Sequence, residues 1–124
     1  LQKTHTTYHP YAFLTEDMSH AYALADIVVY RGGLGTLTEI AALKKPAICV
    51  PKPGHQEKNA NFFRTHNMVR VVGEQASPAD LQKTIQALID TKSKTNEMVA
   101  SLVTALPIPK SQEILDVLVR TISK

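Results

Sequence analysis

Three short apolar runs constrain the fold of this 124-residue chain more than any other feature: "IVVY" (27–30), "AICV" (47–50) and "MVRVV" (68–72). Continuous apolar runs rich in β-branched residues are typical of strands that are covered on both faces, as in parallel sheets. Between them lie "TLTEIAALKK" and "NANFFRTHN", each long enough for a helix that leads to the next parallel strand. The alternation predicts an α/β fold, a Rossmann-like parallel sheet with helices on both faces.

The flanking segments extend this pattern. "YAFLT" (11–15) is a short apolar-aromatic run that predicts one more strand, and Asp17 then opens a helix in which Met18 and Tyr22 share one face. Ser77-Pro78-Ala79-Asp80 combines an N-cap, a proline at the first helical position and an acid in the first turn, so it predicts a helix to about Ile89. A further helix is expected in "SKTNEMVASLVTAL", and an amphipathic terminal helix after a proline-rich break within 107–124. The length fits one domain, 1–124.

Composition limits the classes of partner and location. The net charge of +3 comes from scattered lysines and arginines without a basic stripe, which argues against nucleic acid as a partner and leaves attraction to an anionic membrane surface open. No apolar run approaches the roughly 20 residues of a spanning helix, and the first residues do not resemble a signal peptide. We therefore expect a cytoplasmic protein. The single cysteine, Cys49, lies inside an apolar run and is interpreted as a buried residue.

A glycine cluster follows the run 27–30. Gly32, Gly33 and Gly35 lie where a parallel strand passes into a helix, the place where open α/β sheets bind ligands. Two interpretations remain open: a tight turn, or a turn that brings backbone N–H groups and the positive end of a helix to a diphosphate. Thr36 and Glu39 fit a T-x-x-E capping box, but Glu39 also suits the hydroxyl groups of a ribose.

The loop after the next strand, "VPKPGHQEKNA", brings His55, Gln56 and Asn59 to the same edge of the predicted sheet. Their side chains form hydrogen bonds with hydroxyl groups. Taken singly, each is more often a surface residue or a helix cap than a ligand, and only their place at the adjacent strand end favours binding. Arg31, at the end of the first run, is placed to pair either with a phosphate or with a neighbouring acid.

Taken together, these segments resemble the carboxyl-terminal, nucleotide-sugar-binding domain of the family 28 GT-B glycosyltransferases. "DMSHAYALADIVVYRGGLGTLTEIAALKKPAICVP" is similar to the family's D-M-x-x-A-Y-x-x-A-D, strand, R-[SG]-G-x-x-T-x-x-E, helix and proline pattern, and "HQEKNA" to its H-Q-x-x-N-A. The resemblance covers about residues 11 to 72 and is specific as a combination. It implies the donor-binding part of a transferase that moves N-acetylglucosamine from UDP-N-acetylglucosamine to a lipid-linked acceptor, lipid I, in peptidoglycan synthesis.

The resemblance also implies roles for single residues. Thr15 lies where the backbone of the family holds uracil, and Met18 borders that pocket. Glu39 would bind the ribose hydroxyls, while His55 and Gln56 fall where paired polar residues, often two glutamines, contact the sugar. His55 is a departure from that pair and leaves the identity of the sugar open. The diphosphate and the sugar would meet the turn formed by Gly33, Leu34, Gly35 and Thr36.

Some features of the family do not occur in this sequence, and they bear on the cofactor and on the catalytic residues that we expect. No D-x-D motif occurs, in keeping with a family that stabilises the leaving UDP with a helix dipole and basic groups instead of a metal, so we expect neither a metal nor another cofactor. The first strand of the family's domain, its GGSxGA-like turn and the amino-terminal domain with the general base are missing from this sequence. We therefore assign no catalytic residue and expect the chain by itself to be inactive. Transfer is expected only together with the missing amino-terminal domain or a partner subunit, at the inner face of the cell membrane.

Three alternatives stay open. "PGHQEKNA" has some likeness to the glycolipid glucosyltransferases of the same family, which would make diacylglycerol the acceptor. UDP-N-acetylglucosamine 2-epimerases have a similar architecture, but usually carry two consecutive acids after the glycines, where Thr38-Glu39 supplies one. The third is a non-catalytic subunit that only binds the donor.

Overall fold

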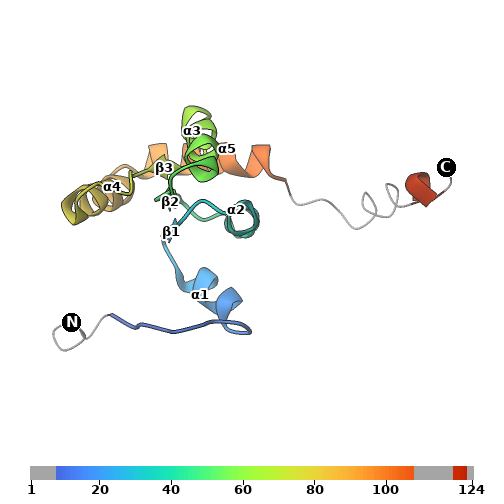
Figure 1. Cartoon of the computed structure of the whole chain (residues 1–124), viewed down its shortest axis with the longest axis horizontal. Helices are drawn as coiled ribbons and strands as arrows, with labels where there is room; N and C mark the ends of the chain where they lie inside the picture. The colour runs from blue at the N-terminus through green and yellow to red at the C-terminus, as the bar shows by residue number, and fades with distance from the viewer. Residues whose placement is uncertain (1–7, 108–118, 123–124) are drawn as a thin grey trace.

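The computed structural model describes residues 8–107 and 119–122, which form a parallel sheet of three strands surrounded by helices (Figure 1). The strands pair in the order β1-β2-β3. In chain order the elements are α1 (Met18–Leu24), β1 (Val28–Tyr30), α2 (Leu34–Ala42), β2 (Ala47–Cys49), α3 (His55–Thr65), β3 (Arg70–Val71), α4 (Pro78–Asp90) and α5 (Lys92–Ala105). The three apolar runs that predict strands thus form β1, β2 and β3, and the α/β fold class is confirmed.

The register of the sheet brings the carboxyl ends of its strands to one edge. Tyr30 is paired with Cys49, and Cys49 in turn with Val71. The N–H of Val50 donates to the carbonyl oxygen of Tyr30 at 2.8 Å, and the N–H of Val72 to that of Cys49 at 2.9 Å. Because all three strands run in the same direction, the connections that follow them lie side by side at this edge.

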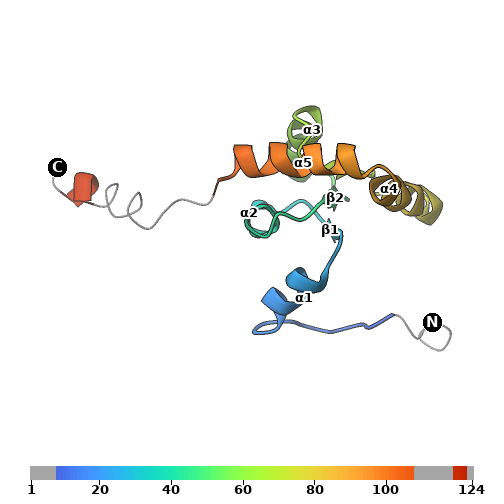
Figure 2. The same ribbon diagram turned by 180° about the vertical axis from the view of Figure 1, so that it is seen from behind.

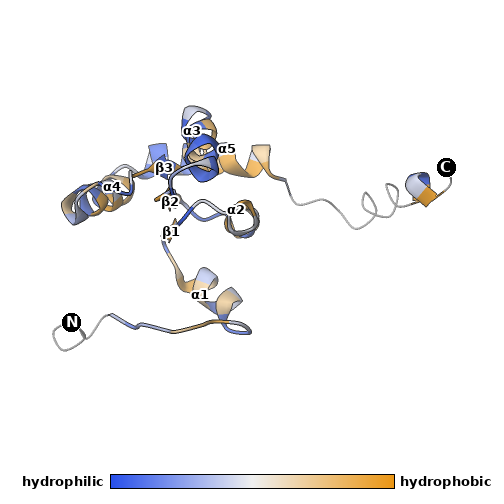
Figure 3. Ribbon diagram, in the orientation of Figure 1, coloured by the Kyte–Doolittle hydropathy of each residue, from blue (hydrophilic) through white to orange (hydrophobic). Residues whose placement is uncertain are grey.

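Two hydrophobic clusters cover the two faces of the central strand. Ala47 and Cys49 contribute to one cluster, whose other members include Leu37 and Ile40 of α2 and Phe63 of α3. Ile48 points to the opposite face, as alternation along a strand requires, and packs in a cluster with Leu88 of α4 and Met98 of α5. The prediction of helices on both faces is therefore confirmed. Figure 3 shows apolar colour on the strands and polar colour along much of α3.

Helix α5 contributes to both clusters, through Leu102 in the first and Met98 in the second. Figure 2 shows it running past α2, α3 and α4 in a single continuous rod. The Thr95 hydroxyl donates to the carbonyl oxygen of Leu88 at 2.7 Å, which ties the beginning of α5 to the end of α4.

The start of α4 agrees with the sequence prediction. The Ser77 side chain accepts from the N–H of Asp80, and the Asp80 carboxylate accepts from the N–H of Ser77, which completes a capping box with Pro78 in the first turn. Helix α5 ends at Ala105, before Pro107. The terminal helix expected within 107–124 lies largely outside the described residues, of which 119–122 are helical. None of the helices in the described ranges is long and apolar enough to cross a membrane.

The predicted strand at 11–15 is wrong. This segment is irregular, and its two aromatic side chains, Tyr11 and Phe13, are 68% and 83% exposed. A strand needs a neighbour that accepts its backbone hydrogen bonds, whereas this segment lies beyond α1, apart from the sheet (Figure 1). Within the described residues the alternation therefore yields three strands instead of four, and β1 is an edge strand in which Val29 is 44% exposed.

Candidate functional site

Helices α2 and α3 both begin at the carboxyl edge of the sheet. The first hydrogen bond of α2 runs from the N–H of Leu37 to the carbonyl oxygen of Gly33 at 3.2 Å. The N–H groups of Leu34, Gly35 and Thr36 therefore have no carbonyl acceptor within the helix. Such groups, together with the partial positive charge of the helix end, attract anions.

The three glycines of the turn differ in what the fold requires of them. Gly32 is buried with φ +117°, and a Cβ there would lie 3.2 Å from the Cβ of Gln56 and 3.4 Å from the Sγ of Cys49. Gly33 has an ordinary φ of −68°, and a Cβ on Gly35 would meet nothing within 4 Å. The tight turn therefore explains Gly32 and leaves the other two glycines unexplained.

Alanine at position 32 is expected to lower the free energy of unfolding by about 1–2 kcal/mol, because L-residues rarely adopt this φ and Gln56 must move. Urea unfolding followed by circular dichroism measures this difference. Gly35→Ala is the matched control: it adds the same methyl group in open space within a helix, and should raise stability by about 0.5–1 kcal/mol. Equal stability of Gly32→Ala and wild type would contradict the assignment of strain to Gly32.

The capping box, one of the two interpretations of Thr36 and Glu39, does not form. Helix α2 begins earlier, at Leu34, with the extended residue Gly33 as its N-cap, so Thr36 already lies inside the first turn. Glu39 is consequently in the middle of the helix, with an exposed side chain. Capping does not account for its carboxylate.

Glu39 instead faces α1 across a cavity of about 310 Å³. Met18 and Tyr22 of α1 line this cavity together with Glu39 and the end of α2. Burial, followed by the neighbouring Glu39 carboxylate, raises the pKa of the Tyr22 hydroxyl. Thr15 lies exposed just before α1, where its carbonyl oxygen accepts from the N–H of Met18 at 3.4 Å. The structure therefore brings Met18 and Glu39 together and adds Tyr22, which sequence reasoning treated only as part of a helix face.

The segment that begins with His55 and Gln56 was predicted to be a loop, and this is wrong for these two residues, whereas Asn59 also began the predicted helix and does lie in one. Gly54, with φ +102°, ends the proline-containing connection, and α3 starts at His55. Gln56 is half-buried against Gly32, and its Oε1 accepts from the backbone N–H of Lys52 at 3.1 Å. His55 and Asn59 are exposed on α3. Gln56 thus joins the two connections that follow β1 and β2.

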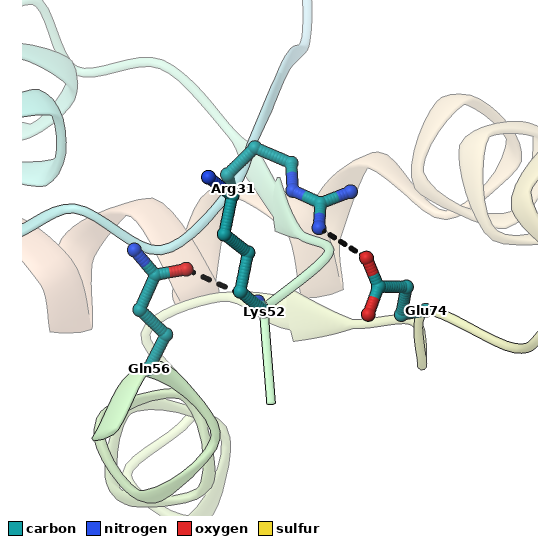
Figure 4. A network of polar contacts seen from close by, with 4 residues as sticks. All are labelled: Arg31, Lys52, Gln56 and Glu74. Carbon is teal, nitrogen blue, oxygen red and sulfur yellow. Dashed lines mark hydrogen bonds and ion pairs between the residues drawn. The ribbon is translucent and has the colours of Figure 1, made fainter. Parts of the chain in front are cut away.

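Arg31 pairs with an acid in this structure. Its guanidinium donates from Nη2 to Oε1 of Glu74 at 2.6 Å, and both side chains are partly exposed. Figure 4 shows the guanidinium turned toward Glu74, while the Gln56 amide is turned toward Lys52. Sequence reasoning missed Glu74 and Lys52, although each closely follows a predicted strand and their place at the carboxyl edge could have been inferred.

Beneath this edge the sheet presents no reactive thiol. Cys49 is fully buried, and burial raises its pKa, which confirms the prediction of a buried cysteine. Burial, then the neighbouring Cys49 thiol, raises the pKa of Tyr30 as well. Among the described residues, no three His, Cys, Asp or Glu side chains are grouped so that they would hold a metal ion. At this edge the described residues present the backbone N–H groups at the start of α2 and the guanidinium of Arg31.

Comparisons with known proteins agree with this architecture. The family model for the glycosyltransferase family 28 C-terminal domain matches residues 1–112. Among curated proteins, the chain is similar to the UDP-N-acetylglucosamine–N-acetylmuramyl-(pentapeptide) pyrophosphoryl-undecaprenol N-acetylglucosamine transferases of two bacteria. The identity is 36% over 89 residues for that of Caldanaerobacter subterraneus subsp. tengcongensis, covering 68% of this chain and 24% of the relative. It is 32% over 103 residues for that of Listeria welshimeri, covering 79% of this chain and 28% of the relative.

Among solved structures, the chain is similar to MurG of Acinetobacter baumannii. The TM-score is 0.68 at 27% sequence identity, and the match covers 86% of this chain and 32% of that one. The chain thus spans about a quarter of the length of these curated relatives. Since the family model matches most of the sequence, the chain belongs to the glycosyltransferase family 28 carboxyl-terminal domain family.

Proposed function

We propose that this chain binds UDP-N-acetylglucosamine as the donor part of a glycosyltransferase. In this proposal the complete protein transfers N-acetylglucosamine to a lipid-linked acceptor, lipid I, in peptidoglycan synthesis, as the names of the related transferases indicate for those proteins. Transfer to such an acceptor would place the complete protein at the inner face of the cell membrane.

One observation carries the proposal: Gly33 and Gly35 lack side chains where the fold does not require glycine. A glycine inside a helix costs about 1 kcal/mol relative to alanine. In return, the missing side chain of Gly35 leaves open space beside the N–H groups at the start of α2. A diphosphate fits such a site, because it is small, carries several charges and accepts hydrogen bonds from backbone N–H groups. Leu34 and Thr36 would contribute the neighbouring N–H groups.

The position of Glu39 supports a nucleoside next to this diphosphate. Glu39 follows Leu34 by five residues, which along a helix axis is about 7.5 Å. That separation suits the distance between a pyrophosphate and the hydroxyl groups of the adjoining ribose. A carboxylate is a strong acceptor for two vicinal hydroxyl groups. In this arrangement the base would extend along the cavity toward Met18, and Thr15 precedes α1 in the chain.

The sugar would then lie on the other side of the diphosphate, toward the start of α3. His55 and Gln56 are the first two residues of that helix, and Asn59 follows one turn later. Their imidazole and amide groups form hydrogen bonds with hydroxyl and acetamido groups. Arg31, at the end of β1, would pair with the phosphates.

The chemistry assigned to this chain is donor binding and stabilisation of the leaving group. In an inverting transfer the acceptor hydroxyl attacks the anomeric carbon, the bond to the diphosphate breaks, and UDP keeps the electron pair. The positive end of α2 and Arg31 would stabilise the charge that develops on UDP. We assign no catalytic residue to this chain, so the base that takes the proton from the acceptor would belong to another part of the protein.

A ligand series tests the proposal with the wild-type chain. Isothermal titration calorimetry with UDP, UMP and uridine is expected to give at least a roughly tenfold loss of affinity from UDP to uridine, since charge-assisted hydrogen bonds contribute about 1.5–3 kcal/mol each. ADP is the control for the base and should bind more weakly than UDP. Equal affinities for UDP and uridine would remove the diphosphate from the start of α2 and overturn the proposed site.

A further inference from the structure

The ion pair between Arg31 and Glu74 spans the end of the central strand. Arg31 directly follows β1, Glu74 lies three residues after β3 ends at Val71, and β2 is between them in the sheet. The contact of 2.6 Å therefore joins the first and the third connection at the carboxyl edge (Figure 4). The ion pair therefore lies at the edge of the sheet where the proposed function places a diphosphate.

This pair is easily broken. The side chains of Arg31 and Glu74 are 48% and 36% exposed, and exposed ion pairs add little to stability because water screens them. A guanidinium forms charge-assisted hydrogen bonds with carboxylates and with phosphates, and a diphosphate offers it more than one negative charge. Arg31 is also only two residues from Gly33, the N-cap of α2, so its side chain is attached beside the proposed diphosphate position.

We propose that Glu74 is an intramolecular competitor of the diphosphate for Arg31. Without ligand, the Glu74 carboxylate holds the guanidinium across the carboxyl edge of the sheet. A bound diphosphate pairs with Arg31 in place of Glu74. Because the ion pair must break first, Glu74 lowers the affinity for the nucleotide. This inference rests on the proposed function, because it needs a diphosphate at the start of α2.

Calorimetric titration of UDP into wild type and Glu74→Gln at low ionic strength tests the inference. Glutamine keeps the size of the side chain but removes its charge. We expect Glu74→Gln to bind UDP about two- to fivefold more tightly, the equivalent of an exposed ion pair. Binding of uridine should not change, and the gain should shrink in about 1 M salt, where screening is strong. Glu97→Gln, the same change at an exposed position of α5, is the matched control and should leave the affinity for UDP unchanged.

A double-mutant cycle separates competition for Arg31 from a general effect of charge. In the Arg31→Gln background there is no guanidinium to release, so Glu74→Gln should raise the affinity for UDP by less than it does in wild type. The same gain in both backgrounds, or no gain in either, would overturn the inference. If UDP binds and Glu39→Ala weakens it while Glu74→Gln has no effect, only this inference fails. If neither wild type nor Glu74→Gln binds UDP, the proposed function fails with it.

Discussion

The variant Gly35→Asp is expected to bind UDP about 30- to 150-fold more weakly than wild type while being no less stable. A carboxylate at position 35 would lie about 5 Å from a diphosphate at the start of α2, and repulsion at intermediate dielectric constant amounts to about 2–3 kcal/mol. Space is available, since a Cβ at this position meets nothing within 4 Å. An acid in the first turn of a helix is itself favourable by about 0.3–1 kcal/mol. Calorimetry for binding and thermal unfolding for stability measure the two effects separately.

Gly35→Asn is the matched control, because asparagine has the shape of aspartate without its charge. It should bind UDP with an affinity between those of wild type and Gly35→Asp. If both variants lose affinity equally, bulk at position 35 and not charge is responsible. Wild-type affinity in Gly35→Asp would mean that no anion binds at the start of α2.

Glu39→Ala is expected to weaken UDP binding by about 1–3 kcal/mol, because the ribose hydroxyls lose a charged acceptor. Glu39 is exposed in the absence of ligand, so the free energy of unfolding should change by no more than about 0.5 kcal/mol. Titrations with UDP and with 2′,3′-dideoxy-UDP give the decisive comparison. Wild type should distinguish the two ligands, whereas Glu39→Ala should bind both with similar affinity.

Glu97→Ala serves as the control for the loss of one negative charge and should bind UDP as wild type does. If Glu39→Ala retained full affinity and still preferred UDP to the dideoxy ligand, another group would have to hold the ribose, and Glu39 would leave the site.

The strands of the sheet could be predicted from the sequence because their secondary structure follows from burial. Ile48 and Cys49 are fully buried on opposite faces, so continuous apolar composition was a reliable indicator of that strand. The start of α4 was predicted for a different reason: Ser77 and Asp80 form a local capping box that does not depend on the rest of the chain. The resemblance to the family was equally informative, and the family assignment is confirmed.

The errors concern residues whose structure depends on distant partners or on the backbone of glycine. Tyr11 and Phe13 have the composition of a strand, but the described residues offer them no neighbouring strand. Helix α2 begins at Leu34 with Gly33 as its N-cap, so Thr36 and Glu39 do not form the capping box that their spacing suggested. The positive φ of Gly54 let α3 start at His55, which local composition did not indicate. The pairing of Arg31 with Glu74 links positions 43 residues apart and required the folded sheet.

Because α5 supplies Leu102 to one hydrophobic cluster and Met98 to the other, neither side of the sheet is complete without it. During synthesis α5 leaves the ribosome after β1, β2 and β3, because it follows them in the chain. Until α5 emerges, the sheet therefore exposes apolar surface on both sides. Such long-range closure slows folding and gives chaperones time to bind the unfinished chain.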